Sequence, residues 1–107
     1  MQTITAEQTP VADNPHGVDV RHLYQNPHVM VSQITLEPGE VVNPHKAPVD
    51  VFFYVVEGAP SIEVAGETVT VEVGTLVPST AGHVHSIRNE GLGRVRFLVV
   101  KTPNPRA

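Results

Sequence analysis

Six histidines in a chain of 107 residues are the side chains here best suited to acid–base or metal chemistry near neutral pH. The chain contains no cysteine, so disulfide scaffolds, thiolate metal sites and cysteine nucleophiles are excluded. We interpret three of the histidines as solvated or structural, because histidines are mostly exposed or intermediate in burial. They are His16, His22 and His28. The other three have more informative surroundings.

His83 and His85 flank a single residue, Val84. In an extended segment, residues two apart point to the same face, so these two imidazoles have a spacing that suits chelation of a metal. His45 follows a Pro-Gly turn signal and precedes the β-rich segment 50–58. The plainer interpretation of His83 is a loop residue that binds nothing.

The elements that must position these side chains are strands. Twenty residues are Val, which favours strands, and ten Pro and eight Gly divide the chain into short pieces. No eleven-residue stretch free of Gly and Pro sustains a helical apolar stripe. The pattern predicts an all-β domain. The strands are expected at roughly 18–24, 29–36, 49–56, 61–64, 67–73, 75–78, 84–88 and 94–101.

Charge and length limit the classes of function. Seven basic against eleven acidic residues give a formal net charge of -4, which supplies no basic footprint for nucleic acid or an anionic membrane. No apolar run approaches the ~18 residues of a membrane span. We expect a cytoplasmic protein with one domain over residues 18–101, a flexible arm over 1–17 and a tail over 102–107.

Two motifs in order resemble those of the cupin family. The first contains Gly39, His45 and Gly58, and it finishes with Phe-Tyr-Val-Val-Glu-Gly at 53–58. The second motif contains residues that match in register, although Thr80 replaces its usual proline. These residues are Gly74, Gly82, His85 and Asn89. The resemblance implies a small double-stranded β-helix, which is a jelly-roll barrel.

The resemblance also implies a metal held by three histidines and a glutamate inside the barrel. Only His45 and His85 match that set, because Ala47 stands at the second histidine position and Val51 at the glutamate position. His83 could act as a third ligand or as an acid–base group. Asp50 could replace the glutamate only if a β-bulge shifted its register. A site of imidazoles suits a divalent transition metal, of which Zn, Ni, Fe, Mn and Cu are the candidates.

We therefore expect a small molecule bound in the barrel, with or without that metal, and an enzymatic role stays open. The expected pocket walls are Val51, Phe53, Val55 and Val71, which favour a small and partly apolar ligand. The alternative is a metal-free or sensory binding module without catalysis, and a purely structural or regulatory role is a third possibility.

Alternation along the strand 49–56 predicts an outward apolar strip. The strip comprises Phe52, Tyr54 and Val56. An exposed apolar strip usually marks an interface, and a barrel this small buries only a modest part of its surface. We expect a homodimer.

Overall fold

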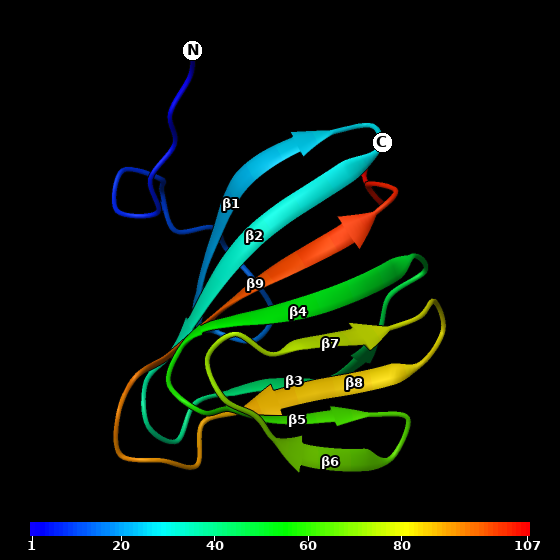
Figure 1. The fold of residues 1–107 in the computed structure, drawn as a ribbon. Coiled ribbons are helices and arrows are strands. Elements are labelled where there is room, and N and C mark those ends of the chain that lie inside the picture. Colours follow the sequence, from blue (N-terminus) through cyan, green and yellow to red (C-terminus); the bar gives the residue numbers. More distant parts are fainter.

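The computed structural model describes residues 1–107 and contains nine strands and no helix, so the all-β prediction is confirmed (Figure 1). No helix is long and apolar enough to cross a membrane. The strands are β1 (Asp19–Asn26), β2 (Val29–Leu36), β3 (Val41–Lys46), β4 (Asp50–Glu57), β5 (Ser61–Val64), β6 (Glu67–Thr70), β7 (Leu76–Ser79), β8 (Val84–Arg88) and β9 (Val95–Thr102).

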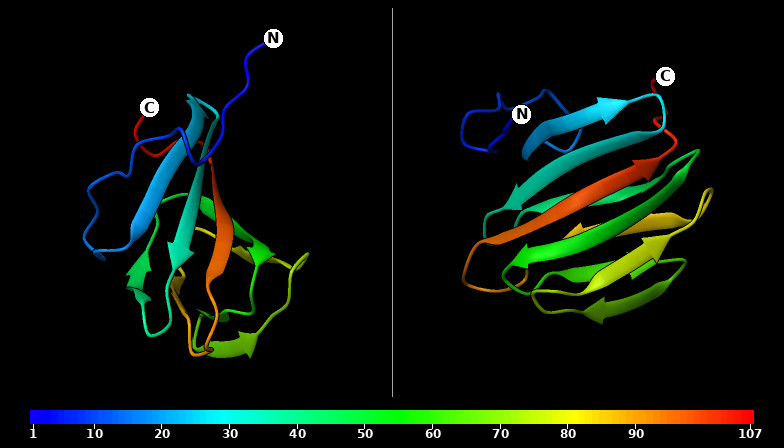
Figure 2. Two further views of the ribbon diagram at one scale, coloured as in Figure 1. Left: turned by 90° about the vertical axis from the view of Figure 1, so that its left-hand side faces the viewer. Right: turned by 45° about the horizontal axis from the view of Figure 1, so that its top comes forward.

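The strands form two antiparallel sheets that face each other (Figures 1 and 2). The five-stranded sheet has the order β1-β2-β9-β4-β7, and the four-stranded sheet has the order β3-β8-β5-β6. Short connections carry the chain back and forth between the two sheets, as in a jelly roll. The predicted fold is confirmed.

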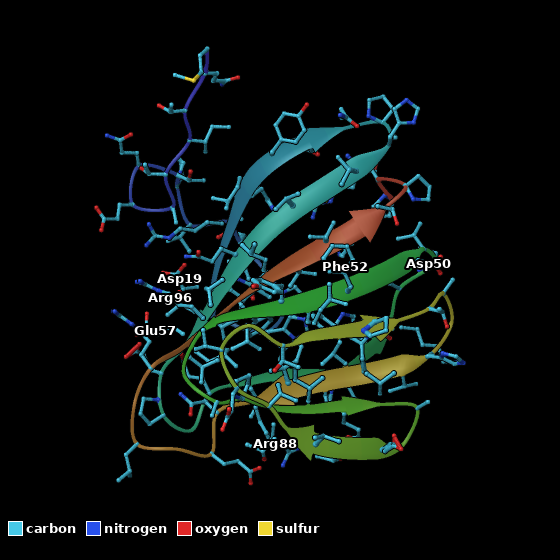
Figure 3. The ribbon with its side chains drawn as sticks, in the orientation of Figure 1. Asp19, Asp50, Phe52, Glu57, Arg88 and Arg96 are labelled. Atoms are coloured by element: carbon cyan, nitrogen blue, oxygen red, sulfur yellow. The ribbon has the colours of Figure 1, made fainter.

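Strand β4 shows how the sequence fills the space between the sheets. Val51, Phe53 and Val55 are 3%, 1% and 0% exposed, so their predicted inward orientation is confirmed. Tyr54 and Phe52 alternate with them on the other face of the sheet, and Figure 3 shows Phe52 in this position. Fourteen buried apolar side chains form one continuous core cluster.

Two turns connect strands through residues suited to them. Ala65 and Gly66 join β5 to β6 with φ angles of 52° and 85°, as a two-residue hairpin turn requires. The buried amide of Asn89 donates to the carbonyls of Leu36 (2.9 Å) and Gly93 (2.8 Å). This amide therefore closes the turn after β8.

Two strand predictions are wrong. None of the expected strands covers residues 41–46, where β3 lies and contains Pro44. Proline is tolerated there because β3 is the edge strand of its sheet, and its register with β8 shifts between Val42 and His45. The segment 67–73 pairs only as far as Thr70, although its alternation continues.

The N-terminal segment lies along β1 (Figures 1 and 2). The Ala12 N–H donates to the Val20 carbonyl at 2.7 Å, and the Arg21 guanidinium donates to the Ala6 carbonyl at 2.7 Å. These contacts bring residues 13–16 to the open end of the barrel.

Candidate functional site

The two sheets enclose a cavity of about 240 Å³, whose wall comes from β1, β2, β4 and β9, from β3 and β8, and from both terminal segments. The polar lining residues are Asp13, Asn14, His16, His22, Ser32, His45, His85, Lys101 and Arg106. The apolar ones are Pro15, Val20, Ile34, Val42, Phe53, Ile87 and Val99. The sequence predicted a histidine pair within apolar walls, whereas the lining combines seven apolar residues with four imidazoles and two cations.

His45 and His85 lie directly opposite each other where β3 pairs with β8. Their two Nε2 atoms are 3.1 Å apart, and the rings meet edge to face with centroids 4.4 Å apart. The two histidines singled out by the motifs therefore come together, although 40 positions separate them in the chain.

The neighbours of the two rings decide which nitrogen carries the proton. The Asn43 carbonyl, 2.9 Å from His45 Nδ1, can only accept, so Nδ1 is protonated and Nε2 offers a lone pair. His85 Nε2–H must then donate to that lone pair, and the Ser79 hydroxyl donates to His85 Nδ1 at 2.9 Å. The pair consequently presents one donor and one acceptor.

His85 is the deeper member of the pair and is only 2% exposed. Burial, followed by the nearby His45, Lys101 and His16, lowers its pKa from 6.5 to about 4. The edge of Phe53 contacts its ring, with centroids 5.1 Å apart. His85 is therefore neutral at pH 7, which makes it a hydrogen-bonding group rather than a cation.

The ligand set implied by the resemblance is not completed by this chain. Ala47 and Val51 are 7% and 3% exposed, and they belong to the apolar core. No group of three or more His, Cys, Asp or Glu side chains is arranged to hold a metal ion. The donors present amount to two imidazoles, fewer than the three protein ligands of an ordinary catalytic zinc site.

The two residues that could have supplied a third ligand lie elsewhere. His83 is exposed, lies outside the cavity lining and has its Nδ1 2.9 Å from the Thr80 hydroxyl. The Asp50 carboxylate accepts from the Ala81 N–H at 2.9 Å, and Figure 3 shows Asp50 at the start of β4. No register shift turns Asp50 toward the histidines.

A second group of polar side chains lines the cavity from β1, β9 and the C-terminal segment. His22 Nδ1 is 2.8 Å from the Ser32 hydroxyl, and burial, followed by the charges of Arg106 and Lys101, lowers the pKa of His22. Burial, followed by Arg106, lowers the pKa of Lys101. The lining therefore holds positive charges close enough that each one disfavours the protonated form of its neighbours.

The N-terminal segment supplies a fourth imidazole. The Asn14 side chain accepts from the His16 N–H at 3.1 Å, which forms a tight turn around Pro15. The Asn43 N–H donates to His16 Nδ1 at 3.1 Å, and the rings of His16 and His45 are 5.1 Å apart. Burial, followed by His45 and Lys101, lowers the pKa of His16.

The sequence predicted some of these positions and missed others. His45, His85 and Phe53 line the cavity, whereas Val51 and Val55 lie in the core beside it. The missed lining residues with chemistry to offer are His16, His22, Lys101 and Arg106. One partial signal was present: Asn-Pro-His occurs at 14–16, 26–28 and 43–45 and Asn-Pro-Arg at 104–106, and only the segment 26–28 lies wholly outside the cavity lining.

A second hollow of about 230 Å³ lies among β5, β6 and β7, and we call it the apolar cleft. It is lined by Ile62, Val64, Glu67, Val69, Val71 and Val77. Val71, which was expected in the pocket wall, lies here instead.

Solved structures share this fold along nearly the whole chain. An RmlC-like cupin from Shewanella frigidimarina is 21% identical, with a TM-score of 0.83 over 94% of this chain and 88% of that one. KdgF from Halomonas sp. is 19% identical, with a TM-score of 0.85 over 96% and 95% of the two chains. A predicted oxalate decarboxylase from Thermotoga maritima is 23% identical, with a TM-score of 0.84 over 96% and 100%.

These identities establish a common fold and do not transfer an activity. Among curated proteins, no sequence matches this one. The family model described as "Cupin domain" matches residues 32–101, which include β3, β4 and β8 with both histidines of the pair. The chain belongs to the cupin domain family.

Proposed function

We propose that this protein binds a small, oxygen-bearing organic molecule in the cavity, with the His45–His85 pair as its hydrogen-bonding centre. The observation that supports this proposal most is a donor and an acceptor placed 3.1 Å apart in a cavity that is open to solvent on one side. A ligand hydroxyl can accept from His85 Nε2–H and donate to His45 Nε2, so it can replace the bond between the rings. The volume has room for about eight waters, or a ligand of similar size.

A second candidate is a divalent transition metal bound by the same pair, with the remaining positions filled by the ligand or water. The separation of the two Nε2 atoms favours it, because two imidazoles on one zinc have nitrogens about 3.0–3.4 Å apart. The Asn43 carbonyl on His45 Nδ1 also resembles the outer partners that orient metal-bound histidines, and the Ser79 hydroxyl can rotate to accept from His85 Nδ1–H when Nε2 binds a metal. The missing third ligand makes this binding weak, so the metal-free module remains our principal proposal.

The experiment compares two double variants. In His45→Ala/His85→Ala the pair is lost, whereas the control, His28→Ala/His83→Ala, removes two exposed imidazoles outside the cavity. Binding of glycerol and lactamide is measured by ligand-detected NMR, with and without a metal chelator. We expect the control to bind like the wild type and the cavity variant to bind at least tenfold more weakly.

The chelator separates the two candidates. Binding that persists in chelator supports direct recognition by the imidazoles, whereas binding that requires added Zn or Ni supports the metal site. If neither compound binds the wild type, or if the cavity variant binds as the control does, the proposed function is wrong.

We also propose that the protein is a homodimer. The strip of Phe52, Tyr54 and Val56 supports this proposal, since Tyr54 and Val56 are 38% and 39% exposed on the outer face of β4. Light scattering behind a sizing column should give about twice the chain mass at micromolar concentration. Tyr54→Glu should lower it toward that of one chain, while a monomeric wild type would contradict the proposal.

A further inference from the structure

We infer that the ligand is a small organic oxyanion, and that Lys101 and Arg106 form a cationic subsite that binds its carboxylate or phosphate group. The inference rests on the proposed function, since it names the ligand class of the same cavity. In this arrangement the imidazole pair holds the hydroxyl part of the molecule, and the two cations hold its charge.

Lys101 is a partly buried cation without a counter-ion. It lies on β9 opposite Met30 and Val51, and it takes part in none of the three ion pairs of the protein. No buried polar atom lacks a hydrogen-bond partner, so its ammonium group must reach the open space of the cavity. Removing a charge from water without a partner is costly, and a bound anion offsets that cost.

Lys101 lines the same cavity as three imidazoles that come from three separate elements: His16, His22 and His85. Its charge contributes to lowering the pKa of each of them, after the larger effect of burial. The cation and the imidazoles therefore face one shared space.

Arg106 is held at the cavity by the C-terminal segment, which Figure 1 shows beside the turn between β1 and β2. The buried Asn104 side chain accepts from the Arg106 N–H at 2.9 Å. Its amide donates to Gln25 Oε1 at 3.1 Å and to the Asn26 carbonyl at 3.2 Å. This turn places a second cation near Lys101, where a planar guanidinium can bind an oxyanion through two parallel hydrogen bonds.

The charge balance of the cavity differs from that of the chain. The chain has a formal net charge of -4, yet the lining holds two cations and one carboxylate, Asp13. Asp13 is exposed and takes part in none of the ion pairs. The lining therefore carries a formal excess of one positive charge, opposite in sign to the net charge of the chain, which favours an anionic ligand.

Two matched pairs of compounds test the inference: lactate against lactamide, and glycerol 3-phosphate against glycerol. Each pair differs mainly in one oxyanion group. The proteins are the wild type, Lys101→Met/Arg106→Met, and the control Lys46→Met/Arg88→Met. The control removes two exposed cations outside the cavity, and Figure 3 shows Arg88 pointing away from the barrel. Arg106→Met alone, at the exposed end of the chain, guards against misfolding of the double variant.

We expect at least one anion to bind the wild type and the control tenfold or more tightly than its uncharged partner. In Lys101→Met/Arg106→Met that preference should fall below threefold, while the uncharged partner binds as before. Which pair shows the preference distinguishes a carboxylate from a phosphate ligand. The single variant Arg106→Met should lose part of the preference for the anion.

Three results would overturn the inference. If the uncharged compounds bind and the anions bind no tighter, the subsite is absent but the proposed function stands. If the control loses as much preference as the cavity variant, the attraction is a general effect of surface charge. If no compound of either pair binds the wild type, both proposals fail together.

Discussion

The cavity and the apolar cleft have almost the same volume, about 240 and 230 Å³, and opposite chemistry. Four imidazoles and two cations line the cavity, whereas five of the six residues lining the cleft are aliphatic. The cavity lies toward the sheet edges β1 and β3, and the cleft lies toward the opposite edges β6 and β7. One barrel thus has two unlike ends.

The terminal segments account for much of the difference. Residues 13–16 and Arg106 complete the wall of the cavity, and no terminal residue lines the cleft. Asparagine side chains fix both segments, since Asn14 and Asn104 each accept from the N–H two residues further on. Four of the nine polar lining residues are therefore added to the barrel by segments outside it, namely Asp13, Asn14, His16 and Arg106.

The largest change in the free energy of unfolding should come from substitution of Phe53, which lies between the cavity and the core. Phe53 is 1% exposed and contacts both His85 and Phe97 edge to face. Phe53→Ala should lower the free energy of unfolding by about 3–5 kcal/mol, because it removes a large side chain from a packed interior. Val69→Ala, on the exposed rim of the cleft, should change it by less than about 0.5 kcal/mol. Urea denaturation measures both, and equal losses would remove the distinction between the two ends.

The second effect is a dependence of stability on pH, which arises from the histidines of the cavity and not from the apolar cleft. The pKa of His85 is about 4 in the folded protein against 6.5 ordinarily, so only the unfolded chain takes up a proton between these values. The contribution of His85 to the free energy of unfolding should be fully present above pH 6.5 and should fall by about 2 kcal/mol as the pH decreases to 4. This fall is smaller than the pKa difference alone would give, because water in the cavity partly solvates the charged ring. His16 and His22, whose pKa values are also lowered, act in the same direction.

Unfolding by urea at a series of pH values checks this dependence. His85→Gln should flatten much of the slope between pH 6.5 and 4. His28→Gln, in the exposed turn between β1 and β2, should retain it. A wild type whose stability is constant over this range would contradict a buried neutral His85.

A smaller effect concerns the docking of the N-terminal segment. The Asn14 amide donates to the carbonyls of Ala12 (3.1 Å) and Val18 (2.7 Å), and its oxygen orients His16. Asn14→Ala should cost about 1–2 kcal/mol of stability and weaken binding in the cavity by threefold or more. Thermal unfolding and the NMR binding assay provide the two readouts.

Asn89→Ala is the matched control, because the Asn89 amide also donates to two backbone carbonyls, those of Leu36 and Gly93, and lies outside the cavity lining. It should lose stability without losing affinity. If both variants bind as the wild type does, residues 13–16 cover the cavity without contributing to recognition.

The barrel could be predicted from the sequence because its signals are local. Val51, Phe53 and Val55 alternate, Ala65-Gly66 marks a hairpin, and the motifs around His45 and His85 keep their spacing. Strand β3 could not be predicted, since Pro44 is acceptable only on an edge strand and edge position is a property of the assembled sheet.

The cationic side of the cavity was missed for a related reason. His22 and Lys101 meet across β1, β2 and β9, and Arg106 joins them through a turn that docks on Gln25 and Asn26. Nothing in the local pattern around Lys101 distinguishes it from an ordinary charged residue at the end of a strand. Its chemistry arises from which segments pack together, and that information is long-range.

The smallest expected effect is a change in the chemical shifts of the methyl groups that line each hollow. Val20 and Val99 line the cavity, whereas Val69 and Val77 line the cleft. A small hydroxylated ligand needs hydrogen-bond partners, which the aliphatic cleft cannot supply, so burial there would cost it the bonds it makes to water. In a titration with lactate or glycerol followed by ¹³C-methyl NMR, the cavity methyls should shift with saturation and the cleft methyls should stay in place. Shifts of equal size in both hollows would mean that the ligand does not distinguish between them, and the polar lining would lose its assigned role.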